Sequence, residues 1–277
     1  MAAFEPWDEI IGQAETQWYV FIADPHNTEA VHQSRIKLRQ LRSMLAAAKK
    51  NVSADEYAAW QQEWGDMAQL LGDLRQWDVL EETWNMIERQ SELVYKNAEA
   101  LPWRRLRETE TERGRTQALT AQAKQPWQRF RAWLEHYRKS VSPRKERRCV
   151  RKRLDKWIHE IERITEQDTA YDDTILMHKR RILGKKLRYA LGAFFPNTDD
   201  GLMSALKRWQ ACLGALNDSE THRRLATEWA DNALLPLEQK GLLIGWEAAL
   251  AAQSREQAQT LEKEVAELYW RWRRFDR

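Results

Sequence analysis

A short pattern of basic residues occurs twice in the sequence, 146 residues apart, and constrains both segments to be helices. A histidine is followed in each copy by basic residues three, seven and ten positions later. At about 100° per residue, these offsets fall within about 80° of one another on one face of an α-helix. We call the two sets the α-helical stripes; they are His32, Arg35, Arg39 and Arg42, and His178, Arg181, Lys185 and Arg188.

The stripes lie in stretches that contain no acidic residue. Residues 30–54 and 174–198 each carry six Lys or Arg and no Asp or Glu, although the chain has 45 basic and 42 acidic residues. A solvated basic helix face normally includes Glu one turn away from its Lys and Arg residues. The missing acids favour an anion-binding surface in both copies, with a solvated face as the alternative.

Composition agrees with helix throughout the chain. Only 10 Gly and 7 Pro occur among 277 residues, which favours an all-α fold and argues against sandwiches, barrels and Rossmann units. The net charge of +3 means that an electrostatic function must come from local segregation of charge. Cys149 and Cys212 fit neither a disulfide framework nor a Cys-based metal site. The chain shows no signal peptide and no membrane span, so we expect a cytoplasmic protein.

Amphipathic periodicity predicts a succession of helices, and several have clear start signals. Ser53 followed by Glu56 forms a capping box, and Thr28 and Pro102 also precede periodic segments. The expected helices cover residues 5–22, 28–51, 53–78, 79–97, 103–124, a short helix within 126–143, a long one from 144, and then 174–194, 199–215, 219–234 and 242–272.

Further landmarks repeat at almost the same offset as the stripes. Leu71-Gly72-Asp-Leu74 matches Leu213-Gly214-Ala-Leu216, and Trp103 matches Trp246, at offsets of 142 and 143. An internal duplication explains three landmarks at nearly one offset. The predicted organisation is one domain, 1–277, with a first helical half at 4–125, a connector at 126–143 and a second half at 144–275.

These motifs together resemble the CHAD family, the conserved histidine α-helical domain. The resemblance rests on the His-x-x-Arg stripe helix and the later Leu-Gly-x-Leu motif, and it covers essentially the whole chain. It implies an all-α fold of two helical bundles related by a pseudo-two-fold axis, around a basic central cavity that binds inorganic polyphosphate. Two residues depart from the family pattern. Gln76 stands where the first copy usually has Asp, and Gly184 interrupts the second stripe helix.

Arginine and lysine in a row about one helical turn apart suit a linear polyanion, because guanidinium forks bind phosphate oxygens and lysine adds point charges. The first stripe continues to Lys49, and the basic cluster that begins at Arg144 could add Arg148 and Arg151 to a cavity wall. We expect the two stripe helices to line one basic channel.

For the stripe histidines and for the acids near the Leu-Gly-x-Leu motifs, the sequence allows more than one interpretation. His32 and His178 either become charged against bound phosphate or stay neutral beside a backbone carbonyl. The acids near the Leu-Gly-x-Leu motifs, Asp73, Asp78, Asp218 and Glu220, orient stripe arginines, ligate a metal associated with the polyanion, or belong to a helix end and the next cap.

The sequence contains no recognisable catalytic motif, so we expect a non-enzymatic protein without cofactor or metal. The resemblance implies inorganic polyphosphate as the ligand, with polyphosphate granules and polyphosphate-metabolising proteins as further candidate partners and granules as a candidate location. Nucleic-acid binding is the alternative for the same surface, but the 15 tryptophans fall at core-like helical spacings and do not interleave with the stripes. A histidine phosphotransfer domain is the alternative from another class; it would leave the long stripes unexplained.

Overall fold

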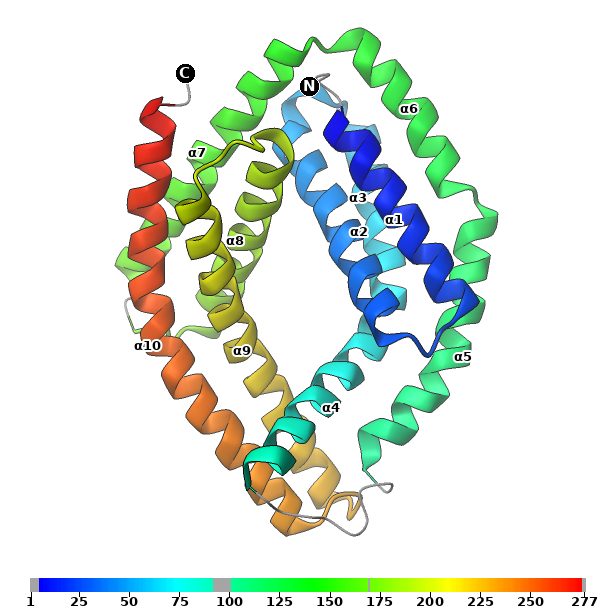
Figure 1. Ribbon diagram of the computed structural model, residues 1–277, viewed down its shortest axis with the longest axis vertical. Coiled ribbons are helices and arrows are strands. Elements are labelled where there is room, and N and C mark those ends of the chain that lie inside the picture. The colour runs from blue at the N-terminus through cyan, green and yellow to red at the C-terminus, as the bar shows by residue number, and fades with distance from the viewer. Residues whose placement is uncertain (1–4, 92–100, 169, 276–277) are drawn as a thin grey trace. The chain divides into compact units, whose positions relative to one another are not determined.

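The computed structural model describes residues 5–91, 101–168 and 170–275. All regular elements in these ranges are helices, as the composition predicts (Figure 1). They are α1 (Glu5–Ala23), α2 (Thr28–Ala48), the 3₁₀ turn η1 (Lys49–Asn51), α3 (Ala54–Leu70), α4 (Gly72–Ser91), α5 (Pro102–Ala123), α6 (Pro126–Ser140), α7 (Pro143–Gln167), α8 (Thr174–Phe194), α9 (Asp200–Asp231) and α10 (Leu237–Phe275).

The chain forms two compact units, Met1–Cys149 and Val150–Arg277, and the boundary lies inside α7. The segment 126–143, which we expected to connect two halves, belongs to unit 1. Its helix α6 contributes Phe130, whose ring lies 6.0 Å from Trp7 of α1 and 4.9 Å from Trp60 of α3. The buried Glu146, at the start of α7, accepts hydrogen bonds from Trp7 Nε1 (3.1 Å) and Tyr137 Oη (2.8 Å). These contacts attach α6 and the first turn of α7 to unit 1.

Tryptophan supplies much of the core in both units. Ten of the 15 tryptophans are buried and the other five are half-buried, so the prediction that they pack the interior is confirmed. Trp60 and Trp64 stack with their ring centroids 5.7 Å apart, as expected for residues one helical turn apart in a core. The rings are therefore engaged in packing, and no tryptophan is available as an exposed stacking platform.

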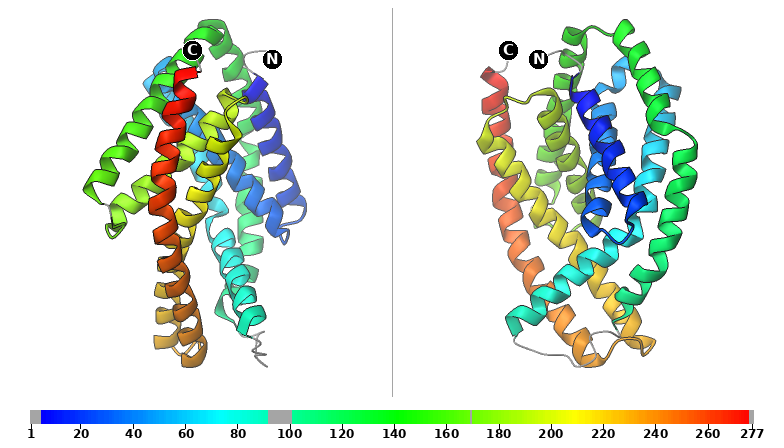
Figure 2. Two further views of the ribbon diagram at one scale, coloured as in Figure 1. Left: turned by 60° about the vertical axis from the view of Figure 1, so that its left-hand side comes forward. Right: turned by 45° about the vertical axis from the view of Figure 1, so that its right-hand side comes forward.

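Unit 2 is built on two long helices, α9 and α10, which run side by side in opposite directions, with α8 packed on α9 (Figures 1 and 2). The helices α8 and α9 approach each other closely at Gly184. A Cβ atom there would lie 2.8 Å from the ring of Trp209, and the Gly184 carbonyl accepts a hydrogen bond of 2.5 Å from Gln210 Nε2. This glycine does not break the stripe helix, because α8 is continuous from Thr174 to Phe194. It allows the two helices to touch.

Several predicted boundaries agree with the structure, and others need correction. The Ser53–Glu56 capping box is present, and α8 has the predicted bounds. The helix expected over 53–78 is divided at Leu71 into α3 and α4. The break expected after residue 215 is absent: α9 continues through it, because Gly214 costs only about 1 kcal/mol in a helix and buried Leu213 and Leu216 hold both sides. Residues 92–97 of the expected helix 79–97 lie outside the described residues.

Candidate functional site

The two stripes lie on α2 and α8, helices of 21 residues each whose first residues are 146 positions apart, like the two histidines. A side chain caps each one. Asn27 accepts a hydrogen bond from the Ala30 amide, and Asp173 accepts hydrogen bonds from the Ile175 and Leu176 amides. Each stripe histidine therefore sits just after a capped N-terminus, with the basic residues following it along the helix.

The stripe of unit 2 opens into a cavity of about 240 Å³. His178 and Arg181 of α8 line it together with Arg223 of α9 and Arg255 of α10. Arg181 Nε is buried and has no hydrogen-bond partner among the described residues. A buried donor without an acceptor is costly, and an acceptor oxygen at this nitrogen would remove that cost. The remaining lining includes Asp172, Thr174, Met177, Asn217 and Glu220.

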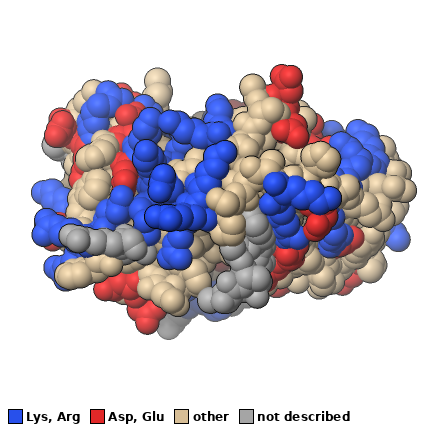
Figure 3. All heavy atoms as spheres, turned by 90° about the horizontal axis from the view of Figure 1, so that it is seen from above, with Lys and Arg blue, Asp and Glu red and all other residues tan. Residues whose placement is uncertain are grey.

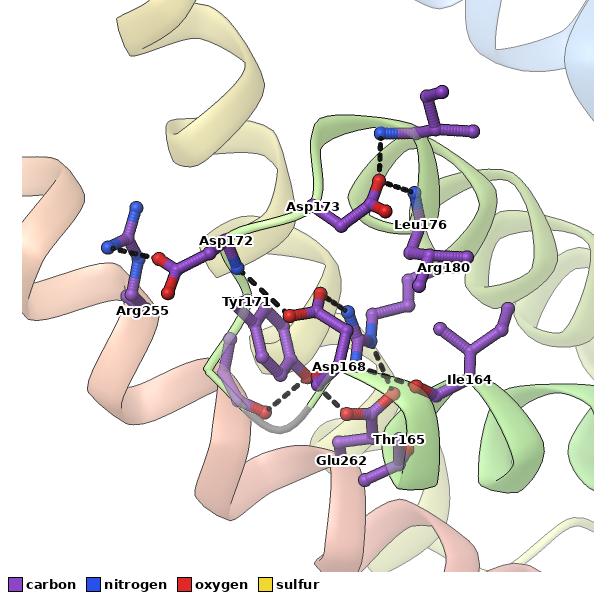
Figure 4. A network of polar contacts seen from close by, with 12 residues as sticks. Ile164, Thr165, Asp168, Tyr171, Asp172, Asp173, Leu176, Arg180, Arg255 and Glu262 are labelled. Atoms are coloured by element: carbon purple, nitrogen blue, oxygen red, sulfur yellow. Dashed lines mark hydrogen bonds and ion pairs between the residues drawn. The ribbon is translucent and has the colours of Figure 1, made fainter.

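A buried ion network beside the cavity fixes the position of α8 (Figure 4). Arg180, which precedes the stripe residue Arg181, has no exposed surface. Its Nη1 lies 2.7 Å from Asp168 Oδ2, and its Nε lies 3.1 Å from Glu262 Oε1. Its guanidinium also lies 4.0 Å from the ring centroid of Tyr171. With Arg180 held in the core, the neighbouring Arg181 is turned by about 100° around the helix axis, toward the cavity.

The network separates the pKa values of its two acids. Burial raises the pKa of Glu262, and its hydrogen bonds from Tyr171 and Arg180 offset this only in part. Burial also acts to raise the pKa of Asp168, but the hydrogen bond and charge of Arg180, together with hydrogen bonds from the Asp172 and Asp173 amides, more than compensate, so its pKa is lowered. Asp168 is therefore the acid whose charge Arg180 stabilises most directly.

The remaining stripe residues of unit 2 lie outside this cavity. Lys185 is half-buried, and the guanidinium of Arg188 lies 4.8 Å from the ring centroid of Tyr189. Arg151 of α7, which the sequence suggested as a wall residue, is half-buried with its guanidinium 5.6 Å from the ring centroid of Phe195. Arg148 is exposed and belongs to unit 1.

In unit 1, contacts within the protein hold two of the stripe arginines. Arg35 Nη1 donates to the Ala68 carbonyl at 2.5 Å, and Arg42 Nε donates to Gln61 Oε1 at 3.2 Å. Glycines stand beside both guanidinium groups: Cβ atoms built at Gly72 and Gly65 would lie 3.5 Å from Arg35 Nη1 and from Arg42 Cζ. These are ordinary van der Waals distances, so a methyl group at either position would pack against a stripe arginine. Arg39 is half-buried on the same helix.

Lys49, which the sequence places at the end of the first stripe, directly follows the α-helix. The α-helix ends at Ala48, and Lys49 begins the 3₁₀ turn η1. Its Nζ lies 4.5 Å from the ring centroid of Tyr57 of α3. Six α-helical steps of about 100° and one 3₁₀ step of about 120° still bring Lys49 back to the side of the helix that carries Arg42.

His32 is half-buried in a positive environment. Burial lowers its pKa, and the nearby charge of Arg75 lowers it further, followed by Arg39; the charges of Glu29 and Glu82 act in the opposite direction. Arg75 itself is bound to Glu82, with Nη1 2.7 Å from Oε1. The neutral imidazole is therefore favoured more than in an ordinary histidine while no anion is bound.

The acids near the Leu-Gly-x-Leu motifs do not act as one group. Asp78 is buried and bound to Arg107 of α5, 2.7 Å away, rather than to a stripe arginine. Asp73 is exposed, and Asp218 accepts a hydrogen bond of 3.1 Å from Asn217 Nδ2. Glu220 alone lines the cavity of unit 2. The helix-end interpretation holds at Leu71 but is wrong in the second copy, where α9 is continuous.

Sequence reasoning missed three arginines that matter for this cavity: Arg180, Arg223 and Arg255. Arg180 is one of three consecutive basic residues, and no spacing rule shows which of them is buried. Arg223 and Arg255 lie on helices without a stripe pattern. Only the packing of α8, α9 and α10 brings them to His178.

Positive side chains are concentrated on part of the surface. Figure 3 shows one face on which Lys and Arg gather in a dense patch, although the net charge of the chain is only +3. None of the described helices is long and apolar enough to cross a membrane, and no group of three or more His, Cys, Asp or Glu in the described ranges is arranged to hold a metal ion.

Comparison with known proteins establishes the family. The family model of the CHAD domain matches residues 7–227. The chain belongs to the CHAD domain family. Its fold is similar to the crystal structure of the CHAD domain from the plant Ricinus communis, with a TM-score of 0.68 and 21% identity over 94% of this chain and 88% of that one. It is also similar to PptA from Streptomyces chartreusis, with a TM-score of 0.59 and 16% identity over 95% and 98% of the two chains. No curated protein matches the sequence.

Proposed function

We propose that this CHAD protein binds inorganic polyphosphate through the stripes of α2 and α8 and that the binding is non-catalytic. The observation that carries the proposal is the cavity of unit 2, where Arg181 Nε is buried without a partner beside His178, Arg223 and Arg255. Three arginines and a histidine around one cavity form a site for a strongly charged anion. The acid-free stripe that leads away from the cavity along α8 offers further contacts to a linear one.

Phosphate is the anion that best fits these side chains. Guanidinium groups bind phosphate oxygens in a bidentate fashion, and several of them together neutralise a densely charged chain. The cavity, at about 240 Å³, is below the about 300–1,000 Å³ of ordinary small-molecule pockets, which favours phosphate groups over a whole nucleotide. The narrower choice of polyphosphate rests on the ligand that the CHAD resemblance implies. On this proposal the protein acts in the cytoplasm or on polyphosphate granules, together with polyphosphate-metabolising proteins.

The packing of the aromatic side chains disfavours nucleic acid as the ligand. Proteins that bind single strands without sequence preference stack bases on exposed aromatic rings. Here the tryptophans are buried or half-buried, and Trp60, Trp64 and Trp127 stack on one another. A phosphate-rich ligand without bases needs no such platform.

A competition experiment tests the proposal. Labelled long-chain polyphosphate is bound to the protein at about physiological ionic strength, and heparin, single-stranded RNA and duplex DNA are added as competitors at equal charge concentration. We expect unlabelled polyphosphate to compete best. Preferential displacement by RNA or DNA would show a nucleic-acid-binding protein instead, and transfer of label from a phosphodonor to His32 or His178 would show phosphotransfer.

We predict that polyphosphate affinity increases as the pH falls from 8 to 6. The pKa of His32 is lowered in the free protein, and bound phosphate should raise it, so binding takes up a proton between these two pKa values. Affinity then rises as the pH drops through the pKa of the complex and levels off below that of the free protein. Dissociation constants at pH 6, 7 and 8 measure this rise.

The variant His32→Gln separates the histidine from the titration of the ligand. End phosphates of the polyphosphate titrate equally with both proteins, so a smaller pH dependence in the variant belongs to His32. Equal pH dependence in the two proteins would show that His32 stays neutral in the complex.

A further inference from the structure

Arg255 of α10 reaches the cavity of unit 2 from outside the stripes, and an acidic side chain already holds it. Its Nη1 lies 3.1 Å from Asp172 Oδ1 (Figure 4). Both residues line the cavity. The side chains of Arg255 and Asp172 are 46% and 69% exposed, so the ion pair is open to solvent and to a ligand. Exposed pairs of this kind contribute only about 0.2–1 kcal/mol, which makes them easy to exchange.

The buried network keeps the backbone of Asp172 in place. The Asp172 amide donates to Asp168 Oδ1 at 3.1 Å, while the other oxygen of Asp168 is bound to Arg180. Tyr171, the preceding residue, has a φ of 60°, and its hydroxyl is bound to Glu262 Oε2 (2.5 Å). A left-handed conformation persists in a tyrosine only where such contacts hold it.

Asp173, the residue after Asp172, caps α8. The chain is thus tethered on both sides of Asp172, while its carboxylate remains free to rotate. Exchange at Arg255 therefore needs only a side-chain movement.

A carboxylate and a phosphate group bind the same edge of a guanidinium. Asp172 therefore occupies on Arg255 a position that a phosphate oxygen could take. Arg181 Nε, in the same cavity, has no partner among the described residues, and Arg223 adds a further positive charge. A phosphate that enters the cavity therefore meets Arg255, which is paired with Asp172, as well as Arg181 and Arg223.

We propose that Arg255 is a phosphate-binding residue and that Asp172 is an internal competitor, which a phosphate group of the ligand displaces from Arg255. The inference rests on the proposed polyphosphate binding and adds one cation and one specificity-determining acid to that site. Asp172 raises the threshold for binding: an anion must out-compete a carboxylate that is always present. Densely charged phosphate chains meet this requirement more readily than weak single anions do.

The test uses the full chain and long-chain inorganic polyphosphate. Asp172→Asn removes the competing charge and should tighten binding by about two- to fivefold, the range that corresponds to an exposed ion pair. Arg255→Gln removes a charge-assisted contact and should weaken binding by about tenfold. In the double variant, Asp172→Asn should bring no gain, because the cation that it competes for is absent.

A second exposed ion pair, which joins α9 to α10, provides matched controls. Arg208 Nη2 lies 2.7 Å from Glu264 Oε1, with side chains 55% and 39% exposed, and neither residue lines the cavity. Glu264→Asn and Arg208→Gln change the net charge by the same amounts. We expect them to change the affinity by less than about twofold, because charges in solution are screened beyond about 8 Å at physiological salt. Thermal unfolding of every variant checks that unit 2 remains folded.

The outcomes separate the inference from the proposed function. If the wild-type protein does not bind polyphosphate, the proposed function itself is wrong. If it binds polyphosphate but Asp172→Asn behaves as Glu264→Asn does, and Arg255→Gln as Arg208→Gln does, the function stands and the inference is overturned. A gain from Asp172→Asn that persists without Arg255 would also overturn it, since Asp172 would then act on another cation.

Discussion

Reversal of four stripe charges, two on each helix, is expected to weaken polyphosphate binding by at least about 1,000-fold. The variant carries Glu at Arg39 and Arg42 of α2 and at Arg181 and Lys185 of α8. Each substitution removes a charge-assisted contact and adds a repulsion, and such contacts contribute about 1.5–3 kcal/mol each. Arg35 is left unchanged because its guanidinium donates to a backbone carbonyl of α3, that of Ala68. Arg42 contacts α3 through the side chain of Gln61, so thermal unfolding of the variant checks that unit 1 remains folded.

Salt dependence gives a second measurement of the same effect. The logarithm of the binding constant falls linearly with the logarithm of the salt concentration, with a slope of about −0.7 per phosphate contact in single-stranded nucleic acids. The slope of the variant should be smaller by about that amount for each lost contact. Isothermal titration at four salt concentrations measures both the affinity and the slope.

The control variant carries four Glu substitutions at exposed basic residues outside the stripes. Two lie in unit 1 and two in unit 2: Arg105, Lys139, Lys207 and Lys263. Its net charge equals that of the stripe variant, so it measures the effect of overall charge alone. Equal loss of binding in the two variants would contradict a local site.

Reversal of one stripe at a time shows how the stripes share the ligand. If both bind the same chain, each two-residue variant loses affinity while the number of chains bound per protein is unchanged. If each stripe binds its own chain, each variant loses about half of the bound chains. The expectation of one channel lined by both helices requires the first result.

Arg180→Met is expected to lower the free energy of unfolding of unit 2 by about 3–5 kcal/mol. The substitution removes the positive partner of Asp168 and Glu262 and leaves both acids in the interior. An uncompensated buried charge costs this much, even where replacing the whole ion pair by apolar residues does not. Urea-induced unfolding followed by circular dichroism measures the loss.

The pH dependence of this loss has a defined sign. Without Arg180 the pKa of Asp168 should rise, and that of Glu262, which burial already raises, should rise further. The folded variant then binds more protons than the unfolded chain, so its stability relative to wild type improves as the pH falls. Arg208→Met removes an exposed ion pair of the same unit and should cost less than about 1 kcal/mol. A loss of similar size in both variants would contradict the account of the buried network.

Most of the fold could be predicted from the sequence, because it depends on local signals. Helical periodicity and capping residues identified α8 to the residue, and Ser53 and Glu56 located the start of α3. The predicted helix boundaries were wrong where packing outweighed the local sequence preference. Gly214 suggested a helix end, but buried leucines on either side of it keep α9 continuous.

For the candidate site too, one part could be predicted from the sequence and another part depends on packing. The sequence by itself determined the stripes, since identity and spacing alone place His178, Arg181 and Lys185 on one helix face and exclude acids from it. Only the tertiary structure decided that Arg180 is a buried anchor while Arg181 lines a cavity. Their side-chain types are identical, and they differ by one position and about 100° around the helix.

The groups that give Arg180 and Arg181 different environments come from distant parts of the chain. Glu262, which binds Arg180, and Arg255, which completes the cavity, both belong to α10. No local pattern records such partners, because the energy of a buried charge depends on the groups that folding brings around it. The sequence thus identifies candidate anion-binding residues, and packing decides which of them line the cavity.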